Sequence, residues 1–147
     1  PDADQLSALV AAADVVLDCT DNFVTRQAVN RACVAHGKPL VAGAAIRFDG
    51  QLSVYDVRDP ASPCYACLFP PDAAFEETLC AVLGVFGPVV GTIGTLQALE
   101  ALKLLAGIGP SLAGRLLMFD GRSASFDTLR VARDPHCGVC AAHRAAP

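Results

Sequence analysis

The sequence predicts one α/β domain over residues 1–147, in which parallel strands are continued by antiparallel hairpins. Three observations lead to this prediction. The 147 residues are 53% apolar, which is enough to bury one core. A strand–helix–strand pattern runs from Asp14 to Ala45 and is typical of the crossover between two parallel strands. Two later extended segments contain Asp-Gly turn signals, which favour hairpins.

The first third of the chain alternates helix and strand. From apolar periodicity we expect a helix over Leu6–Ala13, a strand over Asp14–Asp18, a helix over Phe23–His36 and a strand over Leu40–Ala45. Thr20, Asp21 and Asn22 offer side chains that cap a helix start, and Gly37 suits a helix end. This part of the chain therefore predicts a Rossmann-like sheet.

The rest of the chain favours hairpins around one long helix. One hairpin turns at Asp49-Gly50, and a second joins 116–119 to 125–131 through Asp120-Gly121. Between them we expect a loop over Pro70–Thr78 and a helix over Pro88–Ala106. Three glycines share one face of that helix: Gly87, Gly91 and Gly94. Their spacing predicts a close approach of the helix to the sheet or to a partner chain.

Charge and hydropathy exclude several function classes. The formal net charge is -4 without long runs of either sign, so we expect no nucleic-acid partner. The most apolar stretch, 81–99, contains four glycines and a proline, and we expect no membrane span. The first residues lack a signal-peptide pattern, which predicts a cytoplasmic protein. In that compartment, seven cysteines point to metal or thiol chemistry.

Four of the cysteines form two Cys-x-x-Cys pairs. The first cysteine pair is Cys64 and Cys67, and the second cysteine pair is Cys137 and Cys140. Each spacing lets two thiolates bind one tetrahedral Zn²⁺, and two pairs complete a structural four-cysteine site. Two redox pairs or two local disulfides are the alternatives, and His136 is a possible extra ligand.

Two further positions are candidates for chemistry. Asp18 to Asn22 lie where a buried strand ends and a helix begins, the place where α/β sheets bind ligands. The helix start could hold a phosphate, and Asp21, with Asp18 as a second candidate, could hold a Mg²⁺ ion. Alternatively, an Asp or Asn here simply caps the helix and Asp18 accepts hydrogen bonds from the backbone. Cys80 ends the loop and could be a nucleophile or a packing residue, whereas we expect Cys19 and Cys33 to be packing residues.

Together the motifs resemble the ThiF/MoeB/HesA family of adenylyltransferases, which act on ubiquitin-like sulfur carrier proteins. The resemblance runs from Asp14 to Cys140. It rests on these ordered motifs: Asp18-Cys19-Thr20-Asp21-Asn22 with Thr25-Arg26, Phe48-Asp49-Gly50-Gln51-Leu52, the first cysteine pair, Cys80, Gly87-Pro88-Val89-Val90-Gly91, Leu96-Gln97-Ala98-Leu99-Glu100, Phe119-Asp120-Gly121 and the second cysteine pair.

This resemblance implies a function and its cofactors. It implies ATP and Mg²⁺ at Asp21 and Asn22, with Arg26 at the nucleotide, and structural Zn²⁺ on the two cysteine pairs. It also implies that Cys80 is the thiol that in some members joins the carrier covalently. The reaction would adenylylate the C-terminal carboxylate of a sulfur carrier of molybdopterin or thiamine biosynthesis. Family members are commonly homodimers.

The chain lacks the family's opening strand, glycine-rich turn and cationic phosphate ligands. It therefore matches the C-terminal part of an adenylation domain, and we expect these 147 residues alone to be inactive. The alternative is a zinc-stabilised, non-catalytic module that binds a carrier or forms a dimer. A thiol oxidoreductase that uses the two cysteine pairs is a third, weaker interpretation.

Overall fold

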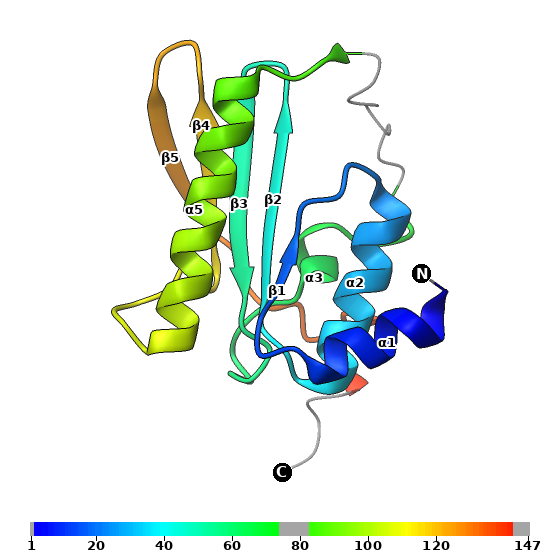
Figure 1. The fold of residues 1–147 in the computed structure, drawn as a ribbon. Helices are drawn as coiled ribbons and strands as arrows, with labels where there is room; N and C mark the ends of the chain where they lie inside the picture. The colour runs from blue at the N-terminus through cyan, green and yellow to red at the C-terminus, as the bar shows by residue number, and fades with distance from the viewer. Residues whose placement is uncertain (1, 74–82, 143–147) are drawn as a thin grey trace.

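The centre of the fold is a single mixed sheet. The structure is a computed structural model that describes residues 2–73 and 83–142. Within these ranges the strands follow chain order across the sheet: β1 (Val16–Asp18), β2 (Leu40–Ile46), β3 (Asp49–Tyr55), β4 (Arg115–Asp120) and β5 (Ser125–Arg130). β1 and β2 are parallel, and every later pair is antiparallel (Figure 1). The predicted α/β sheet is confirmed.

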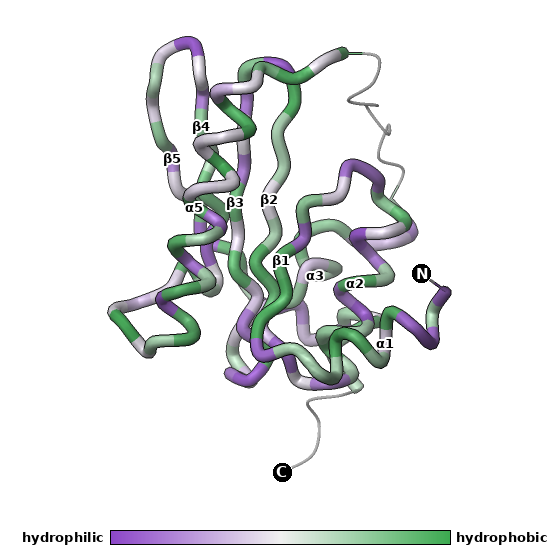
Figure 2. The backbone as a smooth tube through the Cα atoms, viewed as in Figure 1, coloured by the Kyte–Doolittle hydropathy of each residue, from purple (hydrophilic) through white to green (hydrophobic). Residues whose placement is uncertain are grey.

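Helices cover both faces of the sheet. The described helices are α1 (Ala3–Ala12), α2 (Phe23–His36), α3 (Tyr65–Leu68) and α5 (Gly87–Ala106). Successive side chains of β2 point to opposite faces, so that Leu40 packs with residues of α1 and α2 while Val41 packs with residues of α5. Because both faces of β2 are buried over its first four residues, this strand is mainly hydrophobic (Figure 2).

The predicted α2 is confirmed together with both of its caps. Asn22 is the N-cap, and its side chain accepts a hydrogen bond from Thr25 N at 2.8 Å. Gly37 ends the helix in the left-handed region at φ 61°, which favours glycine. The preceding strand is shorter than predicted, because only Val16–Asp18 pairs with β2.

The turn of the first hairpin is not at Asp49-Gly50, so that prediction was wrong. Both residues already belong to β3, and the chain reverses at Arg47 and Phe48. Gly50 has a different role, because a Cβ atom there would lie 2.5 Å from Cγ1 of Ile93 in α5. The glycine therefore permits helix and sheet to approach, which a turn signal in the sequence cannot reveal.

The glycines of α5 do not bring the helix close to the sheet, whereas the alternative expectation, a close approach to a partner chain, stays a prediction. A Cβ atom at Gly87, Gly91 or Gly94 would meet nothing within 4 Å. The close contacts come instead from glycines of the strands, since a Cβ atom at Gly43 would lie 2.4 Å from Cδ of Gln97. The glycine face of α5 points away from the sheet.

By length and hydropathy alone, α5 could cross a membrane. Its inner face nevertheless packs along β2 and β3, as in the core helix of an α/β domain. Two polar side chains of that inner face, Gln97 and Glu100, are buried with it. Glu100 accepts a hydrogen bond from Leu112 N at 2.8 Å and so fixes the return of the chain to β4.

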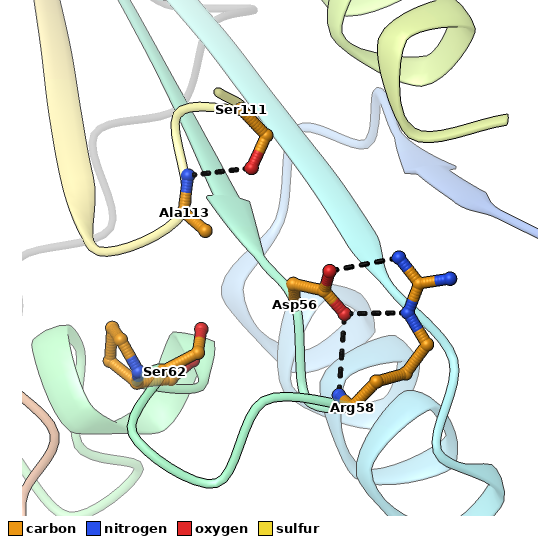
Figure 3. A network of polar contacts seen from close by, with 6 residues as sticks. Asp56, Arg58, Ser62, Ser111 and Ala113 are labelled. Carbon is orange, nitrogen blue, oxygen red and sulfur yellow. Dashed lines mark hydrogen bonds and ion pairs between the residues drawn. The ribbon is translucent and has the colours of Figure 1, made fainter. Parts of the chain in front are cut away.

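A short polar network directs the chain from β3 towards α3. The Asp56 carboxylate accepts two hydrogen bonds of 2.8 Å from the guanidinium of Arg58, together with one from Arg58 N (Figure 3). The exposed pair contributes little stability, on the order of 1 kcal/mol or less. Its effect is local, because it shapes the loop that leads to the first cysteine pair.

We predict that Gly50→Ala destabilises the domain. The added methyl group would overlap Ile93, and overpacking of this kind costs about 1–3 kcal/mol. Gly91→Ala is the matched control, because its methyl group meets no atom and alanine gains about 0.5–1 kcal/mol over glycine in a helix. Urea unfolding measures both variants. Equal stability of Gly50→Ala and wild type would contradict the packing argument.

Candidate functional site

The structure brings the two cysteine pairs together, although they are far apart in the sequence. Cys64 is the N-cap of α3 and Cys67 lies in its only full turn, while Cys137 and Cys140 lie in the turns that follow β5. The Sγ atoms of Cys64 and Cys137 are 3.8 Å apart, and those of Cys67 and Cys140 are 3.6 Å apart. All four sulfur atoms lie within 4.8 Å of one another.

These distances fit a tetrahedral metal site. A zinc–sulfur bond of about 2.3 Å places the sulfur atoms of a tetrahedron about 3.8 Å apart. The sulfur atoms of Cys64 and Cys67 are 3.9 Å apart, so distances within a pair match those between pairs. A disulfide needs about 2.05 Å, and all four thiols are free. The four cysteines could therefore hold a metal such as zinc.

Electrostatics within the cluster favour one thiolate before any metal binds. The hydrogen bond between the sulfur atoms of Cys64 and Cys67 lowers the pKa of Cys67, and backbone N–H groups of Asp134 and Cys64 add to this effect. His136 does not belong to the cluster. Its exposed ring lies 3.9 Å from the Asp134 carboxylate instead.

A pocket of about 640 Å³ lies beside the carboxyl ends of the parallel strands. Four parts of the fold supply most of its walls, and Asp49 to Gln51 of β3 and Met118 of β4 also contribute. The loop after β1 contributes Cys19, Thr20 and Asp21, α2 contributes Phe23 and Arg26, β2 contributes Gly43 to Ile46, and α5 contributes Val90, Ile93, Gly94 and Gln97. Tyr65, next to the first cysteine pair, also lines the pocket. This is the edge of the sheet where α/β proteins bind ligands.

The polar residues of the loop after β1 have two roles. Some stabilise the loop and the start of α2, and Asp21 faces the pocket. Asp18 is buried, and its carboxylate accepts hydrogen bonds from Thr20 N at 2.9 Å and Thr20 Oγ1 at 2.7 Å. Asn22 caps α2. Asp21 remains exposed at the pocket, so of the two carboxylates of this loop it is the one positioned to meet a ligand.

Arg26 holds this loop against the sheet. Its guanidinium is buried and donates hydrogen bonds to the carbonyl oxygen of Thr20 and, at 3.1 Å, to that of Gly43. Charged hydrogen bonds of this kind each contribute about 1.5–3 kcal/mol. The side chain also lines the pocket, so its predicted contact with a nucleotide stays a prediction.

The three remaining cysteines differ in their environments. Cys33 is fully buried, as predicted, and burial, with a smaller contribution from Asp18, raises the pKa of its thiol to about 12. Cys19 is exposed, so its assignment as a packing residue was wrong. Its Sγ atom donates to Gln97 Oε1 at 3.5 Å in the pocket wall. Cys80 lies outside the described residues.

Two residues of this region were not recognised as site residues from the sequence. The side-chain amide of Gln97 donates to the carbonyl oxygen atoms of Asp18 at 2.9 Å and Val41 at 3.3 Å. Asn30 is fully buried in α2 and contacts the first cysteine pair. An uncharged amide on the apolar face of a helix was the available signal, because a buried amide requires partners.

The sheet, the pocket at its carboxyl edge and the cluster of four cysteines that could hold a metal define an α/β domain of Rossmann-like type. The ThiF family model matches residues 2–139. The chain therefore belongs to the ThiF family.

Relatives with established names support this assignment. The chain is 53% identical over 129 residues to the adenylyltransferase and sulfurtransferase MOCS3 of Caenorhabditis briggsae, covering 86% of this chain and 32% of that protein. It is 51% identical over 134 residues to MOCS3 of Bos taurus, covering 90% and 29%. The chain thus spans less than a third of the length of either relative.

Solved structures confirm the fold. The structure of Escherichia coli MccB with ATP has a TM-score of 0.73 and 19% identity, covering 95% of this chain and 43% of that one. The MccB complex with MccA-N7isoASN has a TM-score of 0.75 and 18% identity, covering 96% and 44%. At this identity the likeness concerns the fold alone.

Proposed function

We propose that the native protein uses ATP to adenylylate the C-terminal carboxylate of a ubiquitin-like sulfur carrier protein, in molybdopterin or thiamine biosynthesis. The observation that carries the proposal is the exposed Asp21 carboxylate, which lies at the pocket beside the start of α2. Membership of the ThiF family and the adenylyltransferase name of the relatives support it. Because the chain spans only part of those relatives, the activity is proposed for the native protein.

The reaction joins two anions. A carboxylate oxygen of the carrier attacks the α-phosphorus of ATP, the bond to the β-phosphate oxygen breaks, and pyrophosphate leaves. The protein must therefore neutralise charge and align the reacting atoms. Asp21, with Asn22 beside it, would hold Mg²⁺, which supplies positive charge to the phosphates. The backbone N–H groups at the start of α2 add partial positive charge.

We predict that Asp21→Asn strongly reduces ATP–pyrophosphate exchange in the native protein while its thermal stability stays near wild type. The carboxylate is exposed and does not cap α2, so its loss removes a metal ligand only. Asp127→Asn is the matched control, because it removes an exposed carboxylate of β5 that does not line the pocket, and it should leave exchange and stability near wild type. Wild-type exchange by Asp21→Asn would refute the role of the carboxylate.

The same assay separates Cys80 from adenylylation. Attack on phosphorus needs no enzyme thiol, so Cys80→Ala should leave exchange within a few fold of wild type. We propose that the Cys80 thiolate acts afterwards, by displacing AMP to form a thioester with the carrier. Alternatively, Cys80 first takes the terminal sulfur of a persulfide donor, whose thiolate leaves, and the resulting Cys80 persulfide displaces AMP to form an acyl disulfide with the carrier. A native protein with its metal but without any exchange would favour the non-catalytic, carrier-binding module.

We also propose that the four-cysteine cluster holds structural Zn²⁺. Four thiolates leave no open coordination position, which is typical of a structural site. The cluster fastens the segment after β3 to the segment after β5, and Val34, Val57 and Ala66 pack around it. We propose a cytoplasmic location, whose reducing conditions keep the thiols free.

We predict about one zinc per chain in protein purified without added metal. Metal removal should lower the melting temperature strongly, because structural zinc contributes on the order of 10 kcal/mol in zinc-finger peptides. Cys140→Ser should lose the metal, whereas Cys19→Ser, which alters an exposed thiol outside the cluster, should keep it. Two disulfides and no metal, found by mass spectrometry and elemental analysis, would refute the zinc site.

The outer face of α5 supports a proposed homodimer. Apolar side chains that are between 51% and 63% exposed are Leu99, Leu102 and Leu105 in its C-terminal half and Ile108 just beyond its end. The two charged residues of α5, Glu100 and Lys103, pair with each other at 2.6 Å. An apolar helix face without free charge suits a self-complementary contact with a second copy.

We predict that the native protein scatters light as a dimer at micromolar concentration. Leu102→Glu should yield monomers, because a carboxylate would be buried at the contact without a partner. Val24→Glu is the matched control, since Val24 is a 74% exposed apolar residue of α2, away from this face. A monomeric wild type would exclude the dimer.

A further inference from the structure

A buried amide of α2 lies directly against the first cysteine pair. Asn30 is 0% exposed, in the middle of the helix. Asparagine favours neither helix interiors nor buried positions, so its amide requires partners. Both partners belong to the segment that starts α3: the backbone N–H of Tyr65 and the sulfur of Cys64.

The orientation of this amide follows from the chemistry of its partners. Tyr65 N lies 2.9 Å from Asn30 Oδ1, and a backbone N–H group can only donate. The atom that faces Tyr65 must therefore be the side-chain oxygen, which places the NH₂ group towards the sulfur. Nδ2 lies 3.6 Å from Cys64 Sγ, within range of an N–H···S hydrogen bond.

We propose that Asn30 is a positioning residue of the metal centre, which donates a hydrogen bond to the Cys64 thiolate and holds it in place for the metal. This inference rests on the proposed zinc site. Four thiolates around Zn²⁺ leave a net charge of minus two, and Cys64 is fully buried, away from water. N–H donors then offset the excess negative charge on sulfur.

α2 also holds the other end of α3, through a residue that makes no hydrogen bond to a sulfur atom in the structure. Gln27 is 3% exposed, and its Nε2 atom donates to the carbonyl oxygen of Phe69 at 2.6 Å. Gln27 and Asn30 thus fasten the two ends of one short helix, and only Asn30 contacts a thiol in these hydrogen bonds. Gln27 is therefore a matched control for Asn30.

The test replaces zinc by Co²⁺ in the native protein, because cobalt reports on its sulfur ligands through charge-transfer absorption. Asn30→Leu removes both hydrogen bonds of the amide. Asn30→Ser keeps a polar side chain at this position, but the shorter side chain no longer places an N–H donor at the sulfur. In both variants we expect the sulfur-to-cobalt band to move to lower energy, because the thiolate lone pairs lose a hydrogen bond. Zinc affinity in competition with a chelator should fall about 10- to 100-fold.

The control separates this role from helix packing. Gln27→Met should lower the stability of the domain but leave the cobalt band where it is in wild type. An unchanged band and affinity in a folded Asn30→Ser variant would overturn the proposal. If wild type takes up neither Zn²⁺ nor Co²⁺, the zinc site itself fails, which is a different result.

A measurement on the unmodified protein makes the test independent of how the variants fold. Loading the native protein with NMR-active cadmium should give scalar coupling between the metal and an Asn30 side-chain amide proton, transmitted through the Cys64 sulfur. Absence of this coupling in a loaded protein with a resolved Asn30 amide signal would also overturn the proposal.

Discussion

The side chain of Gln97 ties α5 to the backbone of both parallel strands, and the rest of the site depends on this contact. The amide donates to carbonyl oxygen atoms of β1 and β2, and it fits there because Gly43 has no side chain. Its oxygen atom accepts from the Cys19 thiol. The contact therefore fixes where β1 ends, and with it the start of the loop that presents Asp21 to the pocket.

α2 connects the pocket with the metal centre. Its first turn is capped by Asn22, and one turn later Arg26 holds the loop after β1 against β2. Four residues further, Asn30 contacts the first cysteine pair. Tyr65 completes the connection, because it follows Cys64 in the chain and its ring lines the pocket. Phe69, at the other end of α3, also lines the pocket, so the first cysteine pair is connected to the pocket through α2 and through the rings of Tyr65 and Phe69.

Patterns within short segments predicted much of this architecture, whereas contacts between distant segments escaped prediction. The pairing of β1 with β2 and the caps of α2 follow from apolar runs and capping residues. The role of Gly50 does not, since a glycine that admits Ile93 looks the same in sequence as one that makes a turn. Cys19 was misassigned because periodicity does not show whether the residue after a strand faces core or pocket. The spacing of the cysteines revealed the two pairs in the sequence. The contact of Asn30 with the first pair could be recognised only in the folded structure.

The charges around the pocket show that binding of an anionic substrate would require additional positive charge. Asp21 and Asp49 contribute two carboxylates to its described lining, against the single guanidinium of Arg26. That guanidinium already donates to two carbonyl oxygen atoms and is largely shielded from solvent. A nucleoside triphosphate and a carboxylate are both negatively charged. Binding them together here would add negative charge to a pocket whose side chains already carry more negative than positive charge. A metal ion on Asp21 offsets part of this repulsion, and further cations must come from groups outside the described lining. The proposed reaction therefore requires more of the native protein than the pocket walls described here.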